Sequence, residues 1–128
     1  MKTKLKPIFY GIATWLWICL SEFFRNSLLL RKYWVEHYRS LGLIFPEAPL
    51  NGLVWSLWAL SLTGFIYILS QKFSFWKTVG ISWFTGFFMM WLSLGNLQVL
   101  PFTILYMAIP LSFLEIFLGS WIIFGIYK

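Results

Sequence analysis

The sequence predicts an all-α integral membrane protein, built as an antiparallel bundle of four transmembrane helices with an interfacial amphipathic segment after the first. Of its 128 residues, 60% are hydrophobic and only 11% are charged. So few charges do not cover the surface of a soluble domain of this length. Four apolar runs each approach the ~20 residues that a hydrocarbon layer of ~30 Å requires. We expect one transmembrane domain over residues 1–128, with helices at 7–30, 50–70, 75–94 and 99–126, and the interfacial segment at 31–49.

Breaker residues place the ends of the four predicted helices. Pro7 suits the first turn of the first helix, because the N–H that it lacks has no partner there. The cluster "PEAPLNG" precedes the second helix, and such Pro, Asn and Gly clusters mark loops. The short basic turn "SQKFSFWK" leads into the third helix. Pro101 is tolerated near the start of the fourth.

The connecting segment 31–49 has a helical pattern of its own. Large apolar and aromatic residues recur there at spacings of four, three and four, at Trp34, Tyr38, Leu41 and Phe45. Charged residues occupy the positions between them. We expect a short amphipathic helix at the membrane interface, ended by Gly42 and Pro46. A continuation of the first helix out of the bilayer fits the same pattern, and the sequence does not separate the two.

The formal charge of +6 predicts membrane orientation rather than nucleic-acid binding, because nearly all cations lie at helix ends. In a four-span layout, one side carries Lys2, Lys4, Lys6, Lys72, Lys77 and Lys128. The other side carries Arg31, Lys32 and Arg39. Since Lys and Arg are enriched in cytoplasmic segments, we expect a plasma (inner) membrane protein with both termini in the cytoplasm. Its expected partners are the lipid bilayer and either a larger membrane complex or further copies of the chain.

Small residues predict the faces through which the helices pack. In lipid, close approach through small side chains replaces the hydrophobic force between helices. The predicted packing faces are Gly52, Ser56, Ala59 and Thr63 on the second helix, Ser82, Gly86 and Ser93 on the third, and Ala108, Ser112 and Gly119 on the fourth. On the second helix the larger residues Trp55, Trp58, Leu62, Phe65 and Leu69 are predicted to face lipid.

Polar residues inside the predicted spans form the candidate site. Glu22 precedes Arg25 by three residues and Asn26 by four, so the three side chains share one helix face. Ionisable groups at this depth face a bundle interior or water. With Asn96 and Glu115, they are predicted to form an intramembrane polar network. Glu115 has no partner on its own helix, so it either carries a proton or pairs with Arg25 across the bundle. The network either fixes helix register or serves as a relay or substrate site.

Little in the sequence points to catalysis, and we expect no enzyme, cofactor or metal. Asp is absent, which removes a common ligand of Mg²⁺. Phosphate-binding, dinucleotide-binding and nucleophile-elbow motifs are also absent from the sequence. His37 is the one histidine and Cys19 the one cysteine. Neither has the further ligands that a zinc site needs.

The layout of four short spans with a Glu in the first, here Glu22, is similar to that of the small multidrug-resistance transporters. That similarity would make Glu22 a binding carboxylate for a cationic substrate. This chain departs from the pattern, because Arg25 and Asn26 lie beside Glu22 and the first loop is long.

Three function classes follow, and the sequence favours them in this order. The first is a non-catalytic accessory or assembly subunit of a membrane complex, indicated by small size and the lack of a reaction motif. The second is a small proton-coupled or ion transporter that uses Glu22, Arg25 and Glu115. The third is a lipid-modifying membrane enzyme.

Overall fold

The structure is a computed structural model that describes the backbone of residues 2–128 and the side chains from Lys4 onward. The described chain is all-helical, without strands, and the predicted helical class is confirmed. Lys2, which counts toward the predicted orientation, has its side chain outside the described part. Four helices are long and apolar enough to cross a membrane, over Lys4–Leu29, Pro49–Ser70, Phe75–Asn96 and Phe102–Tyr127.

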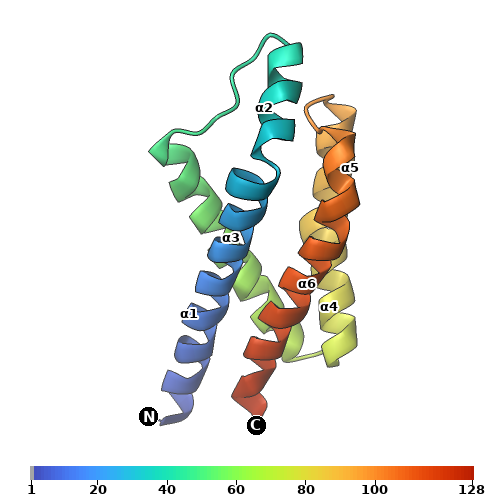
Figure 1. Ribbon diagram of the computed structural model, residues 1–128. Helices are drawn as coiled ribbons and strands as arrows, with labels where there is room; N and C mark the ends of the chain where they lie inside the picture. Colours follow the sequence, from blue (N-terminus) through green and yellow to red (C-terminus); the bar gives the residue numbers. More distant parts are fainter. Residues whose placement is uncertain (1) are drawn as a thin grey trace.

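The first long helix consists of α1 (Lys2–Glu22) and a π-helical segment, Phe23–Leu29. After a break at Leu30 it is followed by α2 (Arg31–Ser40). Figure 1 shows α2 beyond the end of α1, rising from it rather than lying across the bundle. Residues 31–40 therefore extend beyond the first helix after the break at Leu30, and their position at a membrane interface stays a prediction.

The remaining long helices are α3 (Pro49–Ser70), the pair α4 (Phe75–Trp83) and α5 (Met89–Asn96), and α6 (Leu105–Phe124). A π-helical turn, Phe84–Phe88, joins α4 to α5. Single 3-10 turns, Phe102–Ile104 and Gly125–Tyr127, precede and follow α6. Both termini lie at the same end of the molecule (Figure 1), where Lys6 Nζ donates a hydrogen bond to the Lys128 main-chain oxygen at 2.6 Å.

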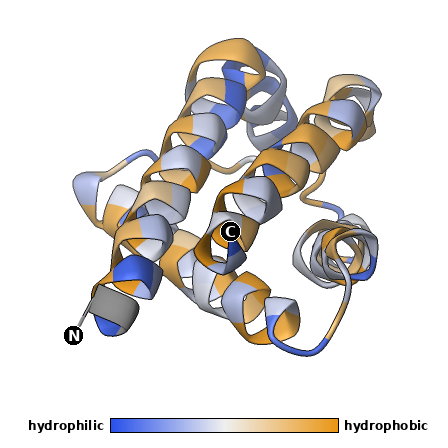
Figure 2. Cartoon of the chain, turned by 90° about the horizontal axis from the view of Figure 1, so that it is seen from below, coloured by the Kyte–Doolittle hydropathy of each residue, from blue (hydrophilic) through white to orange (hydrophobic). Residues whose placement is uncertain are grey.

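The core lies where α6 packs against α1, α3 and α4. Its fully buried apolar side chains come from all the long helices, and include Ile18, Ile66, Phe87 and Ile116. Most of the outer surface of the helices is apolar instead. Figure 2 shows hydrophobic colouring along the helices, with the hydrophilic residues concentrated toward helix ends and turns.

The prediction of the small-residue packing faces is only partly correct. Ala59, Thr63, Ser82, Ala108, Ser112 and Gly119 are buried, and Ser56 and Gly86 are half-buried. Gly52 and Ser93 are exposed. A Cβ atom added to Gly52 meets nothing within 4 Å, because the start of α3 diverges from the other helices (Figure 1). The Ser93 hydroxyl turns back to the Met89 carbonyl of its own helix at 3.1 Å.

The predicted lipid-facing side of the second helix is wrong at two positions. Leu62 and Leu69 are 6% and 9% exposed. The reason is that α3 is contacted by α1 as well as by α4 and α6, so more than one face of this helix is covered. Small residues lie on one contact surface of α3, and leucines lie on another.

Candidate functional site: a buried Glu–Arg–Glu triad

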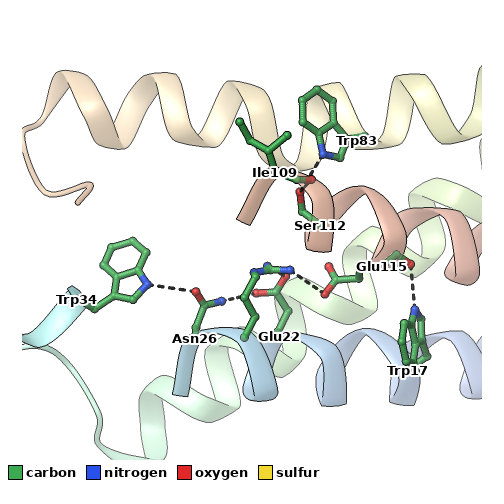
Figure 3. A network of polar contacts seen from close by, with 9 residues as sticks. Trp17, Glu22, Asn26, Trp34, Trp83, Ile109, Ser112 and Glu115 are labelled. Carbon is green, nitrogen blue, oxygen red and sulfur yellow. Dashed lines mark hydrogen bonds and ion pairs between the residues drawn. The ribbon is translucent and has the colours of Figure 1, made fainter. Parts of the chain in front are cut away.

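Three ionisable side chains meet inside the bundle. Arg25 Nη2 lies 2.5 Å from Glu22 Oε1, and Arg25 Nη1 lies 3.4 Å from Glu115 Oε1. Glu22 is 8% exposed, Arg25 3% and Glu115 0%. Figure 3 shows the Glu22 and Glu115 carboxylates approaching the guanidinium from α1 and α6. The pairing predicted between Arg25 and Glu115 is therefore present in the structure, across 90 residues of sequence.

The π-helical segment Phe23–Leu29 positions the cation of this triad. Leu30 N–H donates to the Arg25 carbonyl at 2.8 Å, a five-residue step that widens the last turns of the first helix. Such π-bulges are rare in proteins overall, and those that occur are often found at functional sites. Arg25 and Asn26 both lie within the segment, so the wider turns lie at the height of the triad.

Neighbouring side chains hold Glu22 and Arg25 in place. Asn26 Nδ2 donates to Glu22 Oε2 at 3.0 Å, and Trp34 Nε1 of α2 donates to Asn26 Oδ1 at 3.2 Å. The guanidinium carbon of Arg25 lies 5.1 Å from the centre of the Phe87 ring, within cation–π range. Both Glu22 oxygens thus have a donor, and Figure 3 shows the contacts running across the view from Trp34 on the left to Glu115 on the right.

Glu115 has fewer partners than Glu22. Trp17 Nε1 donates to its main-chain carbonyl at 2.9 Å, a contact that fixes α6 against α1 and does not involve the carboxylate. Glu115 Oε2 is buried and has no hydrogen-bond partner. A buried polar atom without a partner requires an explanation.

A pocket of about 340 Å³ opens between α1 and α6, and Glu115 is one of its lining residues. Arg25 and Glu115 line it together with Trp17, Leu20, Phe24 and Leu114. Except for the two charged residues and Ser21, its lining side chains are apolar. The pocket therefore joins the apolar outer surface to the charged triad.

The charges of the triad do not balance. Two carboxyl groups face one guanidinium, so full ionisation leaves one net negative charge in a setting with little water. Uncompensated buried charge is costly. Neutrality requires one proton or one bound cation, and Glu115 is the carboxyl with a free oxygen to accept it. No group of three or more His, Cys or acidic side chains that could hold a metal ion occurs among the described residues.

Asn96 is not part of this site, and its inclusion in the predicted network is wrong. It is the last residue of α5 and is exposed. The third helix reaches the end of the bundle there, so an amide at this position meets solvent or the surface rather than the interior.

Several contacts of the site have no simple signal in the sequence. The indoles of Trp17 and Trp34 are donors to the triad region, and Trp83 Nε1 donates to Ser112 Oγ at 2.9 Å. Among nine tryptophans, nothing in the spacing singles these out. His37 lies with Nε2 2.8 Å from the Gln98 carbonyl oxygen, which ties α2 to the loop between α5 and α6.

Comparisons of the chain with known protein families, with curated proteins and with solved structures find no match.

Proposed function

We propose that this chain is an integral membrane protein whose Glu115 takes up and releases a proton, as the centre of a small proton-coupled carrier. The observation that carries the proposal is the buried, unpartnered Oε2 of Glu115, in a triad with one carboxyl more than it has cations. Ionisable residues buried in membrane helices commonly mark proton relays and substrate paths.

Insertion as an antiparallel bundle is part of the same proposal. Exposed Leu, Ile, Phe and Trp side chains cover the outer faces of all four long helices, an apolar area far beyond what a soluble monomer exposes. Six cations at the end with the termini, against three at the other end, support a cytoplasmic location for both termini. Reporter fusions at Lys128 and within residues 41–47 test this orientation. Opposite locations of the two fusions are expected, and equal locations contradict it.

Infrared difference spectroscopy in lipid vesicles tests the proton site directly. Wild-type protein shifted between acidic and alkaline buffer should gain and lose the absorption of one protonated carboxyl group. Glu115→Gln should abolish that signal, whereas Glu36→Gln, at an exposed carboxyl of α2, should leave it intact. An unchanged signal in Glu115→Gln overturns the proposal.

A second candidate, the accessory or assembly subunit, has an observation of its own. The segment after α2 exposes Leu41, Leu43 and Ile44, the last at 92%. It is held by Arg31, whose Nε and Nη2 donate to the two Glu47 oxygens at 2.7 and 2.8 Å. An ordered apolar loop at the end of the bundle is suited to contact another protein. Co-purification from mild detergent tests this candidate, with Ile44→Ser expected to release the partner and a chain that purifies alone counting against it.

A further inference from the structure

We infer that the pocket between α1 and α6 binds a neutral, lipid-soluble molecule with one hydroxyl or carbonyl group, which enters sideways from the hydrocarbon layer and hydrogen-bonds to Glu115. The inference rests on the proposed function, because it takes the bundle to lie in a membrane. It adds the chemical class of the substrate and the route by which the substrate arrives.

The mouth of the pocket determines the route. Leu20, Phe24 and Leu114 line it and are 67%, 55% and 47% exposed. In a membrane these three side chains contact acyl chains, so the opening faces lipid instead of water. The volume of about 340 Å³ falls within the range of small-molecule sites, about 300–1,000 Å³. A molecule that reaches the triad through this mouth must first dissolve in the hydrocarbon layer.

The floor of the pocket determines the polar contact. Glu115 Oε2 is fully buried and unpartnered, and the Arg25 guanidinium lies beside it, 3.4 Å from Oε1. Because Glu115 is 0% exposed, a ligand oxygen reaches Oε2 by displacing side chains that line the pocket. It then gains a hydrogen bond in a setting of low dielectric, where such bonds are strong. The same contact satisfies a buried oxygen that otherwise has no partner.

The charges around the floor favour a neutral head group. A cationic head at Oε2 would lie close to the Arg25 guanidinium, and an anionic head would face both Glu22 and Glu115. Either would also lose its hydration while crossing the apolar mouth, at high cost. With one proton the triad is neutral, and a neutral alcohol or ketone meets no net charge.

Hydroxyl and carbonyl groups would use Glu115 differently. A hydroxyl donates to an ionised Oε2 or accepts from a protonated one, whereas a carbonyl accepts only. At Oε2 itself a ketone is bound only by the protonated carboxyl, so this contact should be lost as the pH rises. An alcohol should bind over the whole range. Comparing the two also reports the protonation of Glu115.

The experiment uses the full chain in phosphatidylcholine vesicles and a photoreactive derivative of dodecanol. Labelling should map to residues around Leu20, Phe24 and Leu114. Unlabelled dodecanol and dodecanone should compete, and dodecylamine and dodecanoate should compete about tenfold less well.

Two pairs of variants separate the site from general partitioning. Leu114→Trp fills the mouth and should reduce labelling about tenfold, while Leu57→Trp, at an exposed leucine of α3, should not change it. Glu115→Leu removes the polar contact but leaves Glu22 and Arg25 as a balanced pair, so the chain should fold and labelling should fall about tenfold. Glu115→Gln keeps a hydrogen-bonding head and should still bind the alcohol.

The outcomes distinguish the inference from the proposed function. Loss of the infrared proton signal in Glu115→Gln together with retained dodecanol binding supports both. A normal proton signal with labelling that neither Leu114→Trp nor Glu115→Leu reduces overturns the inference alone. Specific labelling without any infrared proton signal overturns the proposed carrier function but still supports the ligand site. Tighter competition by dodecylamine than by dodecanol overturns the neutral class of ligand.

Discussion

Replacing Arg25 by Met is the most informative test of the triad as a source of stability. The substitution keeps much of the side-chain length and removes the one cation that faces Glu22 and Glu115. It also removes the contact of the guanidinium with the Phe87 ring. Two buried carboxyl groups then remain without a cation between them.

Removing one member of a buried ion pair costs about 3–5 kcal/mol. We expect a loss of that order in the free energy of unfolding of Arg25→Met at neutral pH. Because acid protonates the orphaned carboxyls, the loss should shrink as the pH falls. Adding Glu115→Gln should restore only a small part, because Glu22, the carboxyl that loses the shorter pair, still has no cation.

Reversible unfolding in mixed detergent, followed by fluorescence or by steric trapping, measures these differences. A double-mutant cycle between Arg25→Met and Glu22→Gln isolates the shorter pair, and the same cycle with Glu115→Gln isolates the longer one. A larger coupling energy for the Glu22 cycle is expected. Equal stability of wild type and Arg25→Met would refute the reasoning, because it would mean that the carboxyls are uncharged or hydrated without their cation.

Three further predictions address the rest of the chain. Gly125→Ala places a Cβ atom 2.6 Å from Tyr10 Cε1 and should lower the free energy of unfolding by about 1–3 kcal/mol; Gly11→Ala, which meets nothing within 4 Å, is the control in the same unfolding assay. Gln98 has φ +65, so thermal unfolding should show Gln98→Gly stabilised by up to about 1 kcal/mol and Gln98→Val destabilised. The hydrogen bond from Arg31 lowers the pKa of the Glu47 carboxyl. The ordering of residues 41–48 should therefore persist above the ordinary Glu pKa and be lost as the pH falls through the lowered pKa of Glu47. Hydrogen exchange of these amides checks this, and Arg31→Gln should move the loss to higher pH.

Local pattern was enough to predict the helices and half of the site. Apolar runs bounded by Pro, Asn and Gly predicted four long helices, since length and hydrophobicity are properties of contiguous sequence. Glu22, Arg25 and Asn26 could be grouped because side chains three and four residues apart share a helix face. The break at Leu30 between the first helix and α2 could not be predicted from the same pattern.

The failures have a common physical origin. Helical periodicity predicts which residues share a face, but not where two crossing helices separate. Gly52 and Ser93 share faces with buried residues yet lie near helix ends where no neighbour reaches them. A single packing face on α3 predicts that Leu62 and Leu69 face lipid, whereas α1, α4 and α6 all contact this helix.

By itself the sequence determined that the chain is helical, that four segments are long and apolar enough to cross a membrane, and that Glu22 has a cation within reach. Only the tertiary structure decided the partner of Glu115, because that contact depends on how α6 crosses α1 and joins residues 90 apart. It also decided that Asn96 lies outside the site and that Glu115, which lines an apolar pocket, has one carboxylate oxygen without a partner. Local spacing determines helix faces, whereas helix crossing determines which charges meet.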